Sequence, residues 1–372
     1  MGRSITPLIM PKWGLEMREG TIGWLVDEGD RIEVGTPVID VETDKISNAV
    51  EAPDAGLLRR KVAQEGESLP VKALLAVLAE PEVGDADIDA YIAAYEVPTR
   101  DDEGEASGPD FEWVDVGGIR VRYARRGPER GLPVLLLHGF GGDIGNWLFN
   151  IDALAQDAPV IALDLPGHGQ SDVELPDASL SGLAGFVASF LDQLDVERVQ
   201  VVGHSMGGAI AARLALDHPR RVTSLALVNS AGLGSEIDID YIEGFVRAGS
   251  RRELKPVVER LFADPALASR QLIDDLLKYK RLDGVGSLLE TLSDALFAGG
   301  RQAEMPAQQL DASHLPTLVV WGEDDRIIPA SHATQAPEGA TVVTLPGAGH
   351  MAMMEKAGEV NRLLKAHISR VG

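Results

Sequence analysis

The chain of 372 residues contains no cysteine, which excludes disulfide bonds, thiolate-bound metal ions and a cysteine nucleophile. Positive charge is also scarce: 34 Lys and Arg residues stand against 58 Asp and Glu residues, leaving a formal net charge of −24. Such acidity argues against nucleic acid and anionic membranes as partners, since both are negatively charged. No apolar run approaches a membrane span and no signal-peptide core is found, so we expect a cytoplasmic protein. We also expect no bound metal.

Residues 1–79 carry short apolar runs separated by glycine, and the second half of this region repeats the first. Glu28-Gly29 corresponds to Glu65-Gly66, and Val34 corresponds to Val71 at the same offset. Such self-similarity predicts a small all-β domain in which two matching layers close into a flattened barrel.

Lys45 lies between two strand-like runs, in a polar stretch that predicts an exposed hairpin tip. Together with the segments Met10–Met17 and Glu51–Gly56, this stretch resembles a lipoyl domain, in which a lysine at that hairpin carries the lipoyl group. The resemblance implies covalent lipoate on Lys45. Biotinyl domains share the fold, but their lysine typically lies between two methionines. Asp44 and Ile46 flank Lys45 instead, so lipoate is favoured over biotin.

Residues 80–110 hold eleven Asp or Glu residues against the single Arg100. Like charges repel one another, so we expect an acidic flexible linker between the small domain and the rest of the chain. The spacing of Ile88, Ile92 and Tyr95 predicts one short helix within it. Acyltransferases with a lipoyl domain commonly carry a peripheral-subunit-binding domain at this point, and the segment is too short and too acidic to be one.

Strand-like and helical runs alternate over residues 111–372, which predicts an α/β fold with a mostly parallel sheet between helices. The run Val134–Leu137 is apolar throughout, as in a strand that is buried on both faces. We therefore expect the larger part of the chain to form one α/β domain.

A β-branched run leads into Gly203-His204-Ser205-Met206-Gly207 and then into an alanine-rich helix, the context of a nucleophile elbow. Asp325 follows a later strand-like run, and His350 follows the last one. This order of serine, acid and histidine predicts a catalytic triad of Ser205, Asp325 and His350. The pattern resembles the α/β-hydrolase family, whose Gly-x-x-Asp motif with a proline four residues on favours Asp325. Asp324 stays open as an alternative orienting acid.

A glycine-rich loop, His138–Gly142, follows the first buried strand-like run. Its glycines free backbone N–H groups to face a developing oxyanion. We expect the N–H groups of Phe140 and Met206 to form the oxyanion hole. His138 is expected to brace the loop through hydrogen bonds rather than to transfer protons.

Two further segments resemble parts of the α/β-hydrolase family outside the triad. Asp164 and His168 lie in a loop whose role in the family is mainly structural, so neither is expected to be catalytic. A helical stretch at about 234–313 interrupts the strand series where that fold inserts a cap domain. We expect a helical cap that excludes water and shapes an acyl pocket, in preference to helices packed beside the sheet.

Taken together, the two halves resemble the acyltransferase (E2) component of acetoin dehydrogenase complexes, in which a lipoyl domain precedes an α/β-hydrolase domain. The resemblance implies acetyl transfer from lipoyl-Lys45 to coenzyme A, with thiamine-diphosphate E1 subunits and a dihydrolipoyl dehydrogenase (E3) as partners; we also expect a homo-oligomer. Other 2-oxoacid dehydrogenase acyltransferases use a His-x-x-x-Asp-Gly motif. Here the only Asp-Gly pair is Asp283-Gly284, with Tyr279 at the histidine position. Any transfer would therefore run through the triad or occur elsewhere.

Three functions remain open. The first is acetyl transfer to coenzyme A through an acyl-Ser205 intermediate, the second is a lipoyl-tethered thioester or ester hydrolase, and the third is a non-enzymatic lipoyl carrier or scaffold. The complete triad favours the two enzymes, and transfer is ranked first. Coenzyme A needs a basic or N–H-rich phosphate site, and no P-loop or dinucleotide motif is present. The densest basic cluster is expected to be solvated surface charge: Arg120, Arg122, Arg125 and Arg126.

Overall fold

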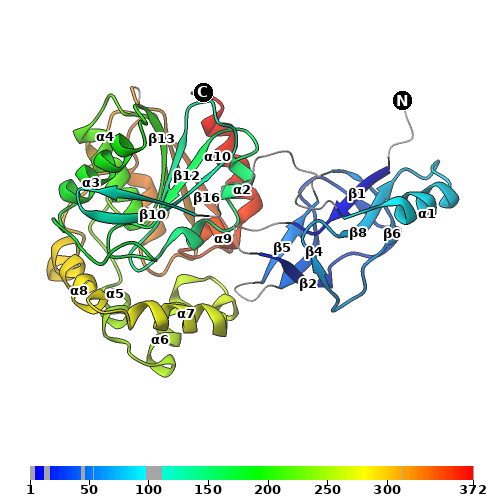
Figure 1. Cartoon of the computed structure of the whole chain (residues 1–372), viewed down its shortest axis with the longest axis horizontal. Coiled ribbons are helices and arrows are strands. Elements are labelled where there is room, and N and C mark those ends of the chain that lie inside the picture. The colour runs from blue at the N-terminus through cyan, green and yellow to red at the C-terminus, as the bar shows by residue number, and fades with distance from the viewer. Residues whose placement is uncertain are drawn as a thin grey trace. The chain divides into compact units, whose positions relative to one another are not determined.

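A computed structural model describes residues 5–11, 17–42, 47–52, 54–97, 111–312 and 314–371. The chain divides into two compact units, Met1–Gly108 and Pro109–Gly372, and each is described by itself (Figure 1). Within the described ranges, no helix combines the length and the apolar character needed to cross a membrane.

The first unit contains two four-stranded antiparallel sheets. One sheet has the strand order β1 (Ile5–Ile9), β8 (Leu74–Ala79), β6 (Gly56–Lys61) and β3 (Arg31–Ile32). The other has the order β5 (Ser47–Glu51), β4 (Pro37–Glu42), β2 (Glu19–Trp24) and β7 (Ser68–Pro70). Both sheets contribute side chains to one apolar core. This arrangement confirms the small all-β domain that the sequence predicts.

The sequence repeat is visible in the strand order, because β1 to β4 of the first half correspond to β5 to β8 of the second. Each sheet combines strands from both halves in the same relative order. The turns correspond as well: the Asp27 N–H donates to the Asp30 carboxylate at 2.8 Å, and the Gln64 N–H donates to the Glu67 carboxylate at 2.8 Å. The repeat therefore encodes two interlocked copies of one four-stranded unit.

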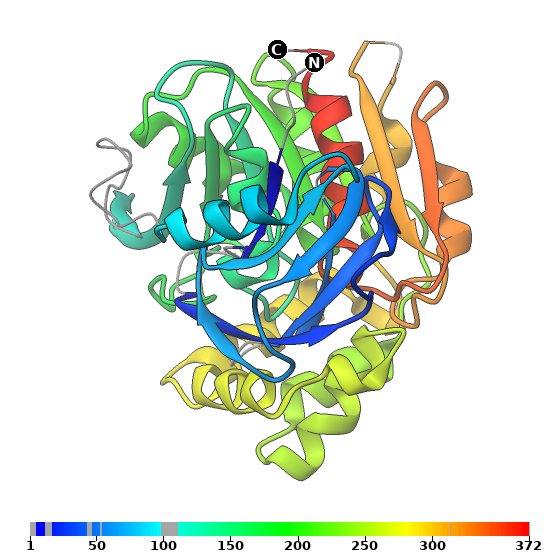
Figure 2. The ribbon, with the colours of Figure 1, turned by 90° about the vertical axis from the view of Figure 1, so that its right-hand side faces the viewer.

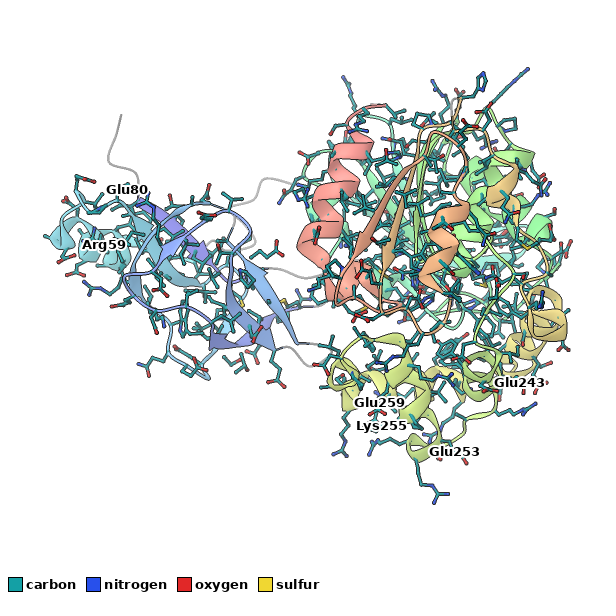
Figure 3. All side chains as sticks on the ribbon, turned by 180° about the vertical axis from the view of Figure 1, so that it is seen from behind. Arg59, Glu80, Glu243, Glu253, Lys255 and Glu259 are labelled. Atoms are coloured by element: carbon teal, nitrogen blue, oxygen red, sulfur yellow. The ribbon has the colours of Figure 1, made fainter. Side chains whose placement is uncertain are left out.

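Helix α1 (Asp85–Ala94) packs on the sheet that contains β8. Ile88 is buried there in one cluster with Leu74, on the side of β8 away from the main apolar core. The Arg59 guanidinium holds the segment before the helix by donating to the backbone oxygen of Glu80 at 2.9 Å (Figure 3). As a result, every residue of β8 is buried.

The range 80–110, expected to be a flexible linker, is described only as far as Val97. In this part the short helix expected from the sequence is present as α1, and it packs on the all-β unit instead of extending from it. The apolar side chains of α1 pack on the apolar face of β8. The acidic composition of the segment gives no indication of this contact. Tyr95 adds an anchor, since its hydroxyl donates to the backbone oxygen of Lys72 at 2.8 Å.

The second unit is built on an eight-stranded sheet with the order β16-β15-β14-β13-β11-β12-β10-β9. The pairs from β16 to β12 are parallel, and β10 and β9 join antiparallel at one edge. The strands are β9 (Glu112–Val116), β10 (Ile119–Arg126), β11 (Val134–Leu137), β12 (Val160–Leu163), β13 (Val199–His204), β14 (Val222–Val228), β15 (Thr317–Gly322) and β16 (Thr341–Leu345).

Helices cover both faces of this sheet, which is why β11, β12, β13 and β15 are buried throughout. On one face lie α3 (Leu180–Gln193) and α4 (Met206–Asp217), and on the other lie α2 (Ile151–Leu154) and α10 (Ala357–Ile368) (Figure 1). The short helix α9 (Ala352–Glu355) precedes α10. The predicted α/β fold class is confirmed.

Four α-helices lie between β14 and β15 in the described part of the chain and gather at one end of the sheet (Figures 1 and 2). They are α5 (Ile239–Arg247), α6 (Arg251–Val258), α7 (Arg270–Lys280) and α8 (Val285–Leu296). Helix α6 begins with a capping box, in which the Glu253 carboxylate accepts the Ser250 N–H at 3.1 Å. Lys255 of α6 forms an ion pair with Glu259, the residue that directly follows the helix (Figure 3). We call these four helices and their connections the cap.

Candidate active site

Ser205 lies between the end of β13 and the start of α4, in the sharp turn of the predicted elbow. Its backbone has φ 51° and ψ −122°, a conformation that is costly for a residue with a side chain. The turn requires glycine on both sides. A Cβ on Gly203 would lie 2.4 Å from the carbonyl oxygen of Gly207, and one on Gly207 would lie 2.3 Å from that of Leu137. The G-x-S-x-G spacing therefore follows from close backbone contacts.

Four neighbouring strands bring the polar residues of the site to one edge of the sheet. Ser205 follows β13, Asn229 follows β14, Asp325 follows β15 and His350 follows β16, and these strands are adjacent in that order. The carboxyl ends of parallel strands share an edge, so residues distant in the sequence become neighbours. The site is shielded from solvent, with Ser205 9% and His350 2% exposed.

The imidazole of His350 faces the carboxylate of Asp325. Nδ1 of His350 lies 2.9 Å from Oδ2 of Asp325, and both side chains are buried. The side-chain amide of Asn229 donates to the same Oδ2 at 2.8 Å, while Oδ1 accepts two backbone N–H groups of the following turn at 2.8 and 3.0 Å. These donors fix the carboxylate, which favours the His350 tautomer with its proton on Nδ1. Asp324 is exposed.

His204, the residue before the serine, contacts His350 as well. Its Nε2–H donates to the backbone oxygen of His350 at 2.9 Å, and the two ring centroids are 4.8 Å apart. Burial lowers the pKa of His204 well below its usual value, so the ring is neutral. Sequence reasoning missed this residue because its partner lies 146 positions away. The middle positions of the elbow motif carry no signal for such a contact.

The loop after β11 passes directly over the serine. A Cβ on Gly139 would lie 3.0 Å from the Cβ of Ser205. The N–H groups of Phe140 and Met206, expected to form the oxyanion hole, donate to no acceptor among the described residues. Both groups are therefore available to an incoming oxygen atom.

His138 braces this loop. Its Nδ1–H donates to the backbone oxygen of Gly139 at 2.8 Å, and its Nε2 accepts the Leu165 N–H at 3.0 Å. Burial lowers the pKa of His138 to about 4. Because both ring nitrogens are engaged with backbone groups and the ring is neutral, these contacts match the bracing role expected from the sequence.

Asp164 and His168 also have structural contacts. The Asp164 carboxylate accepts from Nε of Arg122 at 2.6 Å and from the Ile144 N–H at 2.9 Å. Burial raises the pKa of Asp164 to about 6, although Arg122 acts to lower it. Nδ1 of His168 lies 3.0 Å from the backbone oxygen of Pro166, and burial lowers its pKa to about 3. These contacts match the structural roles that the sequence indicates.

The basic cluster of β10 is not a single solvated surface. Arg122 is only 6% exposed and is paired with Asp164, so the expectation of solvated charge is wrong for this residue. Arg120 lies over the ring of Trp113, 4.3 Å from its centroid. Arg120 and Arg122 are two positions apart and share a face of the strand, yet only Arg122 is buried, because it meets the buried carboxylate of Asp164.

The cap places aromatic side chains beside the oxyanion loop. A Cβ on Gly141 would lie 2.3 Å from the ring of Phe245, which belongs to α5. The ring of Phe140 meets Phe245 and Phe297 edge-on, with centroid distances of 6.1 and 5.9 Å. Lys280 of α7 holds the end of α5 by donating to the backbone oxygen of Phe245. An apolar wall thus borders the loop over the serine.

Tyr279 occupies the position of the histidine in the His-x-x-x-Asp-Gly motif, and its contacts are structural. Its hydroxyl donates to the backbone oxygen of Gly167 at 2.9 Å, and its ring stacks on His168 at 6.3 Å. Burial raises its pKa. These contacts give no sign of a second acyl-transfer centre at this position.

Lys45 lies outside the described residues, as do its neighbours Asp44 and Ile46. The flanking strands β4 and β5 pair antiparallel, with Glu42 opposite Ser47. The four residues between them, Lys45 included, therefore connect two adjacent strands.

Comparison with known proteins agrees with this architecture. A family model described as alpha/beta hydrolase fold matches residues 133–357, and the biotin/lipoyl family model, described as biotin-requiring enzyme, matches residues 6–78. The dihydrolipoyllysine-residue acetyltransferase component of the acetoin cleaving system of Cupriavidus necator is 60% identical over 98% of this chain and 98% of its own. The chain belongs to this family of acetyltransferase components.

Members of the acetoin-cleaving acetyltransferase family differ substantially in sequence. The component from Pseudomonas putida is 49% identical to this chain, over 98% of this chain and 99% of its own. Among solved structures, a bacterial membrane phospholipase A has a TM-score of 0.62 and 27% identity, and the match covers 70% of this chain and 86% of that one. This chain thus combines a biotin/lipoyl-type domain with an α/β-hydrolase domain in one polypeptide.

Proposed function

We propose that this chain is the acyltransferase (E2) of an acetoin-cleaving complex and transfers an acetyl group from lipoyl-Lys45 to coenzyme A through an acyl-Ser205 intermediate. The observation that carries the proposal is the 2.9 Å contact of His350 with Asp325. It lies at the same edge of the sheet as Ser205. The proposal is supported by 60% identity, over nearly the whole chain, to a protein named as such an acetyltransferase component.

Lipoate fits the first unit. The strands β4 and β5, which precede and follow the segment with Lys45, pair antiparallel and belong to two interlocked four-stranded halves. When bound there, lipoate supplies the acetyl group as a thioester. The protein's part is to present that thioester to the serine of the second unit.

The acylation step follows from the orientation of His350. Its Nδ1–H is held by Asp325, so Nε2 serves as the base that removes the proton from the Ser205 hydroxyl. The serine Oγ then attacks the thioester carbonyl, and the Phe140 and Met206 N–H groups donate to the developing oxyanion. His350 returns the proton to the departing thiol, and an acetyl-serine remains.

Deacylation uses the same groups in reverse. Nε2 of His350 takes the proton of the coenzyme A thiol, and the thiolate attacks the acetyl-serine carbonyl. Collapse of the tetrahedral intermediate breaks the ester bond and returns the proton to Ser205. Acetyl-coenzyme A and the free serine are the products.

The burial of the site supports transfer over hydrolysis. Ser205 is 9% exposed, and the rings of Phe140, Phe245 and Phe297 border the loop above it. Limited access of water extends the lifetime of an acetyl-serine until a thiol arrives. A lipoyl-tethered thioester or ester hydrolase is the second candidate, because the same serine machinery discharges to water wherever water enters.

The proposal includes the partners that such a complex requires. Thiamine-diphosphate E1 subunits load the lipoyl group, and a flavin-dependent dihydrolipoyl dehydrogenase (E3) reoxidises it. We further propose a cytoplasmic homo-oligomer. A third candidate, a lipoyl carrier or scaffold without its own chemistry, is disfavoured by the buried His350–Asp325 pair.

The deciding experiment compares the wild type with Ser205→Ala, using lipoylated protein, an acetyl-dihydrolipoyl donor and coenzyme A. We expect transfer to coenzyme A to be abolished in the variant, while lipoylation, read by intact mass, persists and is lost only in Lys45→Ala. Release of free acetate by the wild type in place of acetyl-coenzyme A would favour the hydrolase. Unchanged transfer in Ser205→Ala would favour the carrier.

A further inference from the structure

Glu355 ends α9, five positions after His350, at the end of the sheet that faces the cap (Figure 1). Its two carboxylate oxygens hold different parts of the molecule. Oε1 accepts the N–H of Gly349 at 2.8 Å, and Oε2 accepts the N–H of Ala263 at 2.8 Å. Gly349 precedes His350, whereas Ala263 lies in the cap between α6 and α7. One side chain therefore joins the cap to the loop that carries the imidazole.

The same two segments meet directly as well. The N–H groups of His350 and Met351 both donate to the backbone oxygen of Leu261, at 2.8 and 3.2 Å. A Cβ on Gly349 would lie 2.6 Å from the backbone nitrogen of Ala263. The cap backbone thus lies close against the His350 loop, and the Glu355 carboxylate spans this contact.

The backbone N–H and C=O groups of Gly349 and His350 are all hydrogen-bonded. Glu355 accepts from the Gly349 N–H, and Asn229 donates to the Gly349 oxygen at 3.1 Å. Leu261 accepts from the His350 N–H, and His204 donates to the His350 oxygen. Two of these four bonds depend on the cap or on Glu355. A cap that moved away would break the bond to Leu261 directly and would leave Glu355 without its contact to Ala263.

The charge state of Glu355 matters for this arrangement. Only an ionised carboxylate accepts at both oxygens, because a protonated one presents a hydroxyl donor to one of the two N–H groups. Burial raises the pKa of Glu355, while the N–H groups of Ala263, Gly349 and Met351 act to lower it. The charge of the carboxylate also interacts favourably with a protonated His350.

We propose that Glu355 is a positioning residue that couples closure of the cap to the placement of His350. In the closed arrangement both oxygens are occupied and the loop is held for proton transfer. When the cap leaves, Ala263 withdraws its N–H and Leu261 its carbonyl, and the loop loses its fixed position. The machinery is then assembled only under a closed cap, which limits discharge of an acyl-serine to water. This inference rests on the proposed serine route.

The test compares Glu355→Gln with Glu359→Gln, a matched change on the neighbouring helix where Glu359 pairs with Arg362 at 3.5 Å. An amide accepts only one of the two N–H groups. We expect kcat for transfer from acetyl-dihydrolipoamide to coenzyme A to fall about 10- to 100-fold in Glu355→Gln, with KM for coenzyme A within about twofold. Glu359→Gln is expected to keep the wild-type kcat.

Hydrogen exchange reports the coupling itself. In Glu355→Gln, amide exchange is expected to quicken together in the cap peptide 259–263 and in the loop peptide 349–351, and in neither for Glu359→Gln. Glu355→Asp keeps the charge on a shorter side chain and is expected to give an intermediate kcat. This second variant keeps the proposal testable if Glu355→Gln does not fold. A kcat within twofold of the wild type in Glu355→Gln, or faster exchange in one peptide alone, would overturn the proposal.

The two proposals fail separately. Unchanged acetyl transfer in Ser205→Ala contradicts the serine route, whatever Glu355 does. An inactive Ser205→Ala beside a fully active Glu355→Gln contradicts the coupling alone.

Discussion

His204 donates its Nε2–H to the backbone oxygen of His350 at 2.9 Å, so the residue beside the nucleophile supports the residue proposed as the base. The contact joins the end of β13 to the loop after β16, across the two strands between them. It leaves His350 held at its ring by Asp325 and at its carbonyl by His204. The elbow turn thus contributes two functional residues to the site.

Replacing His204 tests this support. We expect His204→Ala to lower kcat about 10- to 100-fold, because the carbonyl of His350 loses its donor and the loop gains freedom. The buried, unpaired carbonyl also lowers the free energy of unfolding by about 1–3 kcal/mol. Steady-state transfer and urea denaturation measure the two effects. His218→Ala, outside the site, serves as the control, and equal effects in both variants would contradict the assignment.

Substitutions of Asp325 and of its neighbour Asp324 test which of the two is the acid that orients His350. We expect Asp325→Asn to lower kcat about 10³- to 10⁴-fold, because an amide at Oδ2 no longer fixes the Nδ1–H tautomer of His350. Asp324→Asn changes an exposed side chain and leaves kcat within about twofold. The measurement is acetyl transfer at saturating coenzyme A. Comparable losses in the two variants would return Asp324 to consideration.

Replacing two glycines that lie in helices distinguishes the cost of a steric clash from the gain of a residue with higher helix propensity. In Gly207→Ala the new Cβ meets the carbonyl oxygen of Leu137 at 2.3 Å, and we expect unfolding to become easier by at least about 3 kcal/mol. In Gly185→Ala, on α3, the new Cβ meets nothing within 4 Å. That change is expected to stabilise the protein by about 0.5–1 kcal/mol. Chemical denaturation of both variants checks the opposite signs.

Buried histidines predict loss of stability in mild acid. Burial lowers the pKa of His138 to about 4, of His168 to about 3 and of His367 to about 4, against about 6.5 in the unfolded chain. Below pH 6.5 the unfolded state therefore binds more protons, and the free energy of unfolding falls as the pH drops from about 6.5 to 4. Asp164, whose pKa is raised to about 6, acts in the opposite direction, and three histidines outweigh it.

Urea midpoints measured between pH 4.5 and 7.5 report this trend. His367 lies in α10, away from the triad, so His367→Gln removes one titrating group without touching the site. The variant is expected to show a shallower fall of stability with acid. An identical slope in the two proteins would contradict a buried, neutral His367.

Much of the fold could be predicted from local signals in the sequence. The repeat of Glu28-Gly29 at Glu65-Gly66 specified two equivalent β halves, and the strand order shows how they interlock. The glycines around Ser205 identified the elbow because the turn has room for nothing larger. The proline after Asp325 singled out the acid that faces His350.

What the sequence could not provide are contacts between distant segments. Glu355 looks like any helical glutamate until its oxygens are seen to meet Gly349 and Ala263. Arg122 belongs to an arginine-rich stretch, and only the fold pairs it with Asp164. Such roles depend on which strands and loops become neighbours. Composition and spacing do not contain that information.

The packing of α1 on β8 leaves fewer residues to connect the two units. As a helix, the ten residues Asp85–Ala94 span about 15 Å, where an extended chain of that length spans roughly 35 Å. Residues fastened to the first unit cannot lengthen the connection, and a shorter connection raises the effective concentration of one unit around the other. Loosening α1, for example through Ile88, would thus lower the effective concentration of the first unit around the second without altering either one.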